Sequence, residues 1–72
     1  MIRRNRKQIV FELLLHLRNQ ALKLSQLLRK INTTYTDLNS MLSGLIEQEL
    51  ITKDDKYYSL TNKGYIHINN HI

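Results

Sequence analysis

The feature that most constrains the fold is a pair of short strand-like runs near the C-terminal end of the chain. Residues 50–53 (Leu-Ile-Thr-Lys) and residues 56–60 (Lys-Tyr-Tyr-Ser-Leu) flank the acidic pair Asp54-Asp55. Two such runs around a short polar turn predict a β-hairpin. Neither aspartate is the glycine that a two-residue turn prefers, so we expect a slightly longer turn with an acidic tip. The residues before the hairpin have helical periodicity, which predicts a mainly α chain with a small β-hairpin, an α+β fold.

Apolar residues at helical spacing predict three helices before the hairpin. The first should cover residues 4–18. The second should begin at Ser25 as its N-cap, after a weak strand-like alternation over residues 21–24. The third should begin at Thr34, which acts as its N-cap, and end near Gln48. The three apolar stripes are Ile9, Val10, Leu13, Leu14 and Leu17; Leu24, Leu27, Leu28 and Ile31; and Leu38, Met41, Leu42, Leu45 and Ile46.

The second and third helices are separated only by Asn32-Thr33. Two helices joined by so short a break form a helix-turn-helix. Thr61 is expected to cap a last short helical segment after the hairpin. The 72 residues therefore make one domain, residues 1–72, in which residues 1–6 could form a flexible basic arm.

Several classes of function are disfavoured by what the sequence lacks. There is no cysteine for a disulfide or a thiolate metal site. The apolar run from Ile9 to Leu17 carries Glu12 and His16, so we expect neither a signal peptide nor a membrane span, and a cytoplasmic protein. Asp54-Asp55 is favoured as a solvated turn over a catalytic or metal dyad, and the pair His67 and His71 as solvated over metal-binding. No catalytic signature can be assembled, and we expect no enzyme, metal or cofactor.

Positive charge is concentrated in the first part of the chain. Residues 1–30 hold eight basic residues against one acidic residue, a net charge of +7, whereas residues 31–72 hold three lysines against five acidic residues, a net charge of −2. A basic half suits a polyanion such as nucleic acid. Two alternatives stay open: a merely solubilising charge, and, more weakly, an anionic membrane surface.

Phe11 and Leu15 lie about a quarter turn outside the apolar stripe of the first helix. If they are exposed together, they form an apolar patch suited to a partner or to a second copy of the chain. Alternatively, a C-terminal segment covers them within the monomer. The sequence leaves both possibilities open.

Three runs occur in order along the chain: Ile31-Asn32-Thr33-Thr34-Tyr35-Thr36-Asp37-Leu38, Leu45-Ile46-Glu47-Gln48-Glu49-Leu50-Ile51, and Leu60-Thr61-Asn62-Lys63-Gly64. Their order and spacing resemble the small winged helix-turn-helix DNA-binding proteins of archaea and of archaeal viruses and plasmids. The resemblance covers residues 7–68. It implies a three-helix core, a wing made by the hairpin, and a short C-terminal helical segment.

The resemblance implies sequence-directed binding of double-stranded DNA, with the helix of residues 34–48 in the major groove. An asparagine can pair with adenine, and a threonine methyl can contact thymine. The base-reading candidates are Tyr35, Thr36, Asn39, Ser40 and Ser43. This helix has no arginine or lysine, so phosphate contacts must come from elsewhere. Their candidates are Arg3, Arg4, Arg6, Lys7, Lys23, Arg29, Lys30, Lys53 and Lys56.

Two functions from different classes follow. In the first, the chain is a transcriptional regulator that binds double-stranded DNA as a homodimer, with Phe11 and Leu15 as dimer-interface candidates. In the second, the winged-helix scaffold is a protein–protein interaction module, a subunit or inhibitor that does not read DNA directly. The basic first half favours the regulator, whereas the acidic pair and the absence of arginine and lysine from the third helix favour the interaction module.

Overall fold

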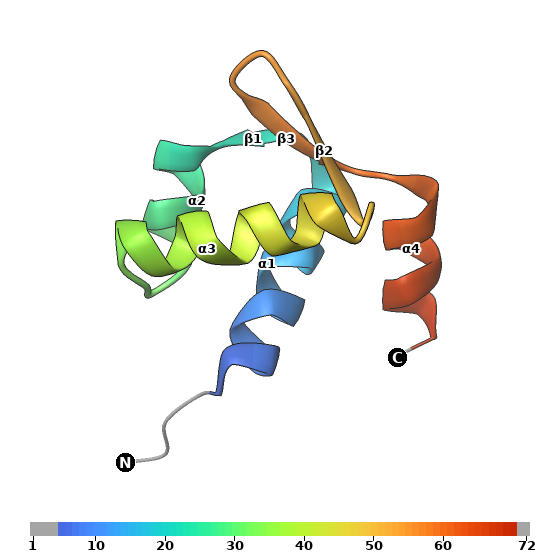
Figure 1. Ribbon diagram of the computed structural model, residues 1–72, viewed down its shortest axis with the longest axis horizontal. Coiled ribbons are helices and arrows are strands. Elements are labelled where there is room, and N and C mark those ends of the chain that lie inside the picture. Colours follow the sequence, from blue (N-terminus) through green and yellow to red (C-terminus); the bar gives the residue numbers. More distant parts are fainter. Residues whose placement is uncertain (1–4, 71–72) are drawn as a thin grey trace.

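The computed structural model describes residues 5–70. This part of the chain forms four helices and a three-stranded antiparallel sheet, whose strands lie between the helices in the sequence. The α+β prediction is confirmed. Figure 1 shows α3 crossing in front of α1, with α2 beside it, the hairpin of β2 and β3 above, and α4 beyond the hairpin. The elements are α1 (Arg6–Asn19), β1 (Leu22–Lys23), α2 (Leu24–Lys30), α3 (Tyr35–Glu47), β2 (Ile51–Asp54), β3 (Tyr57–Leu60) and α4 (Asn62–Asn69).

Side-chain caps define where three of the helices begin. The Asn5 side chain accepts a hydrogen bond from the backbone N–H of Gln8 at 2.8 Å, and the Gln8 side chain accepts one from the backbone N–H of Asn5 at 3.0 Å. This reciprocal pair is a capping box and starts α1. Thr34 and Thr61 cap α3 and α4 as predicted, each accepting a hydrogen bond from the backbone N–H three residues on.

The start of α2 differs from the prediction. Its N-cap is Lys23, so the expectation of a cap at Ser25 is wrong. The reason is the strand before it: Leu22 and Lys23 pair with Tyr58 and Tyr57 of β3, and the chain turns directly from this pairing into the helix. The Gln26 side chain accepts a hydrogen bond from the Lys23 backbone N–H at 2.8 Å. This bond satisfies the backbone N–H group of the N-cap residue of α2.

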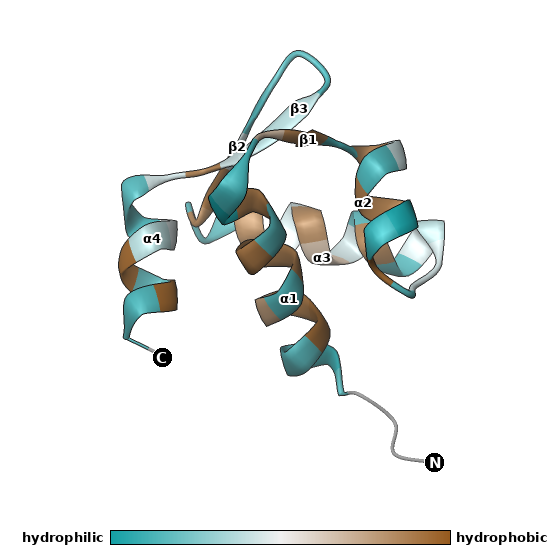
Figure 2. Cartoon of the chain, turned by 180° about the vertical axis from the view of Figure 1, so that it is seen from behind, coloured by the Kyte–Doolittle hydropathy of each residue, from teal (hydrophilic) through white to brown (hydrophobic). Residues whose placement is uncertain are grey.

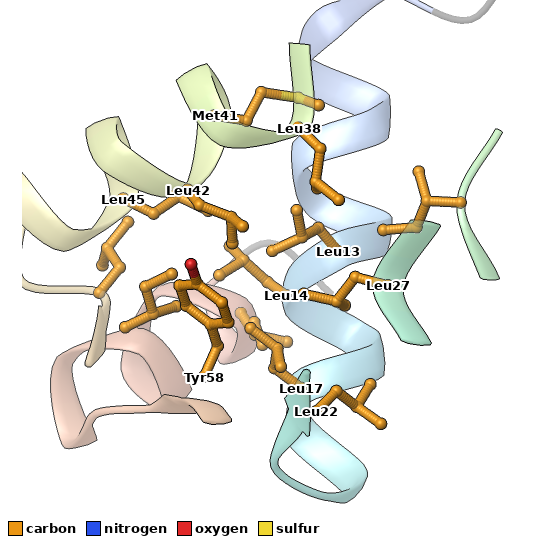
Figure 3. Close-up of a cluster of buried hydrophobic side chains, with 14 residues drawn as sticks. Leu13, Leu14, Leu17, Leu22, Leu27, Leu38, Met41, Leu42, Leu45 and Tyr58 are labelled. Atoms are coloured by element: carbon orange, nitrogen blue, oxygen red, sulfur yellow. The ribbon is translucent and has the colours of Figure 1, made fainter. Parts of the chain in front are cut away.

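One contiguous hydrophobic core joins all four helices and the sheet (Figure 3). Ile9 and Val10 are only partly buried, because the first half of α1 extends beyond the core. The prediction that Ile46 is buried is wrong: its side chain is 39% exposed, since it lies 100° around the helix from Leu45, beyond the edge of the buried stripe. The buried residues are Leu13, Leu14, Leu17, Leu22, Leu27, Ile31, Leu38, Met41, Leu42, Leu45, Leu50, Ile51, Tyr58 and Ile68.

The wing is a tight hairpin whose loop contains only Asp55 and Lys56. Asp54 is still in the ladder, opposite Tyr57, so the expected longer turn is wrong. Asp55 makes the short loop possible by adopting φ +58°, a left-handed conformation that aspartate tolerates better than most residues. β1 pairs with the other edge of β3, which gives the strand order β1-β3-β2.

A left-handed residue also ends α3 and directs the chain into β2. Glu49 has φ +64°, its N–H donates to the Ile46 carbonyl at 2.9 Å, and the Leu50 N–H donates to the Leu45 carbonyl at 3.0 Å. These are the two hydrogen bonds of a Schellman motif, and the buried side chains of Leu45 and Leu50 supply the apolar contact that accompanies it. Glycine is the usual residue at the position that Glu49 occupies.

The same segment is bound to the start of α4 through Thr61. The Thr61 hydroxyl lies 2.6 Å from the Glu49 carbonyl oxygen and 3.0 Å from that of Leu50, and the Thr61 N–H donates to the Leu50 carbonyl at 3.1 Å. Gly64 then passes so close to this segment that an added Cβ would overlap the Leu50 carbonyl oxygen and come within 2.8 Å of Leu60 Cδ2. The end of α3, the base of the hairpin and the start of α4 therefore form one hydrogen-bonded junction.

We predict that Gly64→Ala lowers the free energy of unfolding by about 2–3 kcal/mol, because the new methyl group displaces α4 from the hairpin base. Gly44→Ala is the matched control: a Cβ there meets no atom within 4 Å, and alanine is the better helix former, so stability should rise by about 0.5–1 kcal/mol. Urea denaturation, followed by circular dichroism, measures the free energy of unfolding of both variants. Equal losses in the two variants would contradict the close packing at Gly64.

We predict that Glu49→Gly raises the free energy of unfolding by about 1 kcal/mol, because glycine adopts φ +64° without the steric cost that a Cβ imposes. Glu49→Ala separates this effect from that of the lost carboxylate, since alanine keeps the Cβ and should give no such gain. The same denaturation experiment applies. A gain in the alanine variant as large as in the glycine variant would show that charge, and not backbone conformation, is responsible.

Candidate nucleic-acid interface

The exposed face of α3 runs across the front of the molecule (Figure 1). Four of the five residues predicted to read bases are exposed on it, with Tyr35 at 59%, and Asn39 is half-buried at its edge. Leu38, Leu42 and Leu45 hold the opposite face of the helix against the core. The hydrophobic stripe of α3 therefore fixes which polar residues face outward. The exposed four are Tyr35, Thr36, Ser40 and Ser43.

A hollow of about 390 Å³ lies along one edge of this face, between α3, the start of α2 and the hairpin. Three lysines line it from three different segments: Lys23 from β1, Lys53 from β2 and Lys56 from the hairpin loop. Tyr35 and Asn39 are the α3 residues that line the same hollow. The structure thus places basic side chains next to a helix that carries none of its own.

Two of these lysines are held against tyrosine rings of β3. The Lys23 Nζ lies 5.4 Å from the centre of the Tyr57 ring, and the Lys53 Nζ lies 5.5 Å from that of Tyr58. Each lysine is also the cross-strand partner of its tyrosine. Cation–π contacts of this length restrict a lysine side chain while leaving its ammonium group accessible to an anion. Tyr58 is buried and Tyr57 is 41% exposed, because neighbouring strand residues point to opposite faces.

The tip of the hairpin is less acidic than the sequence predicts. Because Asp54 pairs with Tyr57 in the ladder, the loop contains one acidic and one basic residue, Asp55 and Lys56. The prediction of a tip made by the two aspartates is therefore wrong. Figure 2 shows that the loop is hydrophilic, whereas hydrophobic residues extend along α1.

A basic residue also reaches the α3 face outside the hollow that the lysines line. Arg6 Nη2 donates a hydrogen bond to Ser40 Oγ at 3.1 Å. Arg6 was predicted to belong to a flexible arm, but it is the first residue of α1, because Asn5 caps the helix there. Lys7 is exposed in the same turn. Arg3 and Arg4 lie outside the described residues.

The remaining predicted phosphate contacts, Arg29 and Lys30, are both exposed in the last turn of α2. This turn leads through residues 31–34 into the start of α3. A cation at a helix C-terminus is also favoured by the helix dipole. Their place in the helix-turn-helix agrees with the role given to them from the sequence, but neither lines the hollow beside α3.

Phe11 and Leu15 are half-buried and pack against the core. Helix α4 packs against α1, and its Tyr65 hydroxyl donates to the Arg18 carbonyl at 3.4 Å. The alternative in which a C-terminal segment covers Phe11 and Leu15 stays a prediction. A larger hollow of about 940 Å³ lies beside α1, and its lining includes Phe11 and, from α4, His67. A role of Phe11 and Leu15 in a dimer stays a prediction.

Between residues 5 and 70, no three His, Cys, Asp or Glu side chains come together as a metal site would require. Within the same range, none of the helices is both long enough and apolar enough to span a bilayer. His71, the second member of the predicted histidine pair, lies outside the described residues.

A winged helix-turn-helix family model matches residues 3–70, nearly the whole chain. No curated protein matches this sequence. Domains of this kind typically bind DNA and are not enzymes, which agrees with a basic hollow beside an exposed helix. The chain belongs to the winged helix-turn-helix family.

Proposed function

We propose that this protein binds double-stranded DNA in a sequence-directed manner and acts as a transcriptional regulator. The observation that carries the proposal is that Lys53 and Lys56 of the hairpin line the hollow beside the exposed face of α3, with Lys23 also in its lining. In this arrangement α3 enters the major groove and the hairpin lies next to it, over the sugar-phosphate backbone. The regulator acts in the cytoplasm, where its DNA is accessible.

Base reading is assigned to the uncharged residues of α3. Asn39 has the amide group that pairs with the N6 and N7 atoms of adenine, and the Thr36 methyl group suits the thymine methyl. Tyr35 is exposed at the first turn of α3, where it can contact a base or a sugar, and Ser43 can bond to either a base or a phosphate. These side chains favour a site containing A·T pairs.

Affinity is assigned to the basic residues around α3. Lys23, Lys53 and Lys56 contact phosphates along the hairpin side, and Arg29 and Lys30 do so from the end of α2. Phosphate contacts carry no base information, but they fix the register of a protein on the duplex. If about five phosphates are neutralised, the logarithm of the affinity falls with the logarithm of the salt concentration at a slope of roughly −4 to −5.

We further propose that the regulator is a homodimer. Helix-turn-helix dimers contact two half-sites about one helical turn apart, so a pseudo-palindromic operator is expected. Phe11 and Leu15 remain the candidates for the contact between the two copies. Sedimentation at micromolar concentration tests the homodimer separately from DNA binding. A strict monomer would reject the dimer and the role of Phe11 and Leu15 in it.

Titration of a fluorescent duplex at several salt concentrations tests DNA binding. We predict a steep salt slope, and each of the variants Lys53→Ala and Lys56→Ala should reduce its magnitude by about 1, because each removes one phosphate contact. Lys63→Ala is the matched control. Lys63 is equally exposed, but it lies in the first turn of α4 and not beside the hollow, so the slope should stay unchanged.

No binding by the unaltered protein at low salt would reject the proposal. That result would favour the second function, a winged helix that binds another protein. Equal effects of all three lysine substitutions would show that binding depends on net charge alone and would reject the assigned orientation on DNA.

A further inference from the structure

We infer that Arg6 is the arginine of the α3 face, a phosphate-binding group supplied by α1, and that Ser40 positions it instead of reading a base. The inference rests on the proposed DNA binding. It assigns Ser40 a role different from the one expected from the sequence, and it gives Arg6 a fixed location. The observation that carries it is the hydrogen bond from Arg6 Nη2 to Ser40 Oγ, 3.1 Å long, between residues 34 positions apart.

Arg6 and Ser40 both lie in helices whose backbone is held in place. The capping box of Asn5 and Gln8 sets the first turn of α1, and therefore the direction in which the Arg6 side chain leaves the helix. Ser40 lies in the middle of α3, whose neighbouring residues Leu38 and Met41 are buried in the core. The bond joins two rigid helices, and it limits the freedom of an otherwise exposed arginine side chain.

The bond also brings Arg6 to a part of α3 that does not line the lysine hollow. Asn39 lines the lysine hollow, and Ser40, the next residue, lies 100° further around the helix axis. The exposed face of α3 thus has the lysine hollow along one edge and Arg6 bonded to Ser40, nearer the middle of the face. A helix in the major groove has a sugar-phosphate backbone on each side. Arg6 and the lysines would therefore contact different phosphates of the duplex.

The chemistry of the pair suits a phosphate. A guanidinium group has five N–H donors in a planar fork, and the bond to Ser40 uses one of them. The others are available, because Arg6 is exposed, and the fork matches two phosphate oxygens at once. Ser40 accepts the bond and thereby orients the fork. Ser40 affects the binding affinity only by orienting Arg6 toward a phosphate. Its contribution to affinity should therefore be the same for every DNA sequence.

A double-mutant cycle tests the inference, using the full chain and two duplexes, the preferred sequence and one with its central A·T pairs replaced. Arg6→Ala should weaken binding to both duplexes and reduce the magnitude of the salt slope by about 1. Ser40→Ala should weaken binding to both about three- to tenfold, the range expected for loss of one ordinary hydrogen bond. In the Arg6→Ala background, Ser40→Ala should have no further effect.

Two more variants make the cycle specific. Ser43→Ala removes the same hydroxyl from the same exposed face, but Ser43 does not bond to Arg6, so its effect should be equal in both backgrounds. Ser40→Thr keeps a hydroxyl at the position and should restore most of the affinity lost in Ser40→Ala. Thermal melting by circular dichroism confirms that each variant is folded.

The outcomes separate the inference from the proposed function. If the unaltered protein binds DNA and the effects of Arg6→Ala and Ser40→Ala add, or if Ser40→Ala changes the preference between the two duplexes, Ser40 contacts DNA on its own and the inference is wrong. Such a result leaves the proposed function intact. If the unaltered protein binds neither duplex at low salt, both are wrong.

Discussion

The rest of the structure depends on the junction at which the end of α3, the start of β2 and the start of α4 are hydrogen-bonded together. Glu49 turns the chain through a left-handed conformation, and Thr61 holds that turn through the carbonyl groups of Glu49 and Leu50. Gly64 allows α4 to approach the same carbonyl of Leu50. The junction sets the direction of the hairpin relative to α3, and that direction brings Lys53 and Lys56 to the hollow beside the helix.

Positive charge on this protein is arranged around its exposed helix and not on it. Lys23, Lys53 and Lys56 come from β1, β2 and the hairpin loop, and Arg6 comes from α1 and bonds to Ser40, outside the hollow. These segments meet only when the sheet is formed and α1 packs behind α3. DNA binding by this arrangement would therefore require the folded protein, unlike binding by a flexible basic arm. In the proposed function, the lack of arginine and lysine on α3 would leave base reading to amide, hydroxyl and methyl groups.

The sequence predicted the parts of the fold that local signals determine. Thr34 and Thr61 were identified as helix caps because a side-chain oxygen bonds to a backbone N–H only three residues away. The hairpin followed from two strand-like runs around a polar turn. The cap at Ser25 was wrong because pairing of β1 with a strand about 35 residues later decides where α2 begins. The turn length was wrong because Asp55 accepts a conformation more usual for glycine.

The candidate site was predictable in its residues but not in its geometry. The lysines and the polar residues of α3 could be chosen by type and position, yet their convergence depends on how the hairpin packs. The Arg6–Ser40 bond links residues with no local pattern in common. Side-chain contacts between distant segments follow from tertiary packing, which cannot be predicted from local patterns in a single sequence.

The most direct test of the account is the map of backbone amide shifts in the nuclear magnetic resonance spectrum when a short duplex is added. We predict that the largest changes fall on three regions: the exposed side of α3, the hairpin around Lys53 and Lys56, and the first turn of α1 at Arg6. The residues of α4 around Lys63 should change little. Changes centred on α4, with α3 unaffected, would contradict the central claim that α3 and the basic residues around it form the DNA-binding face.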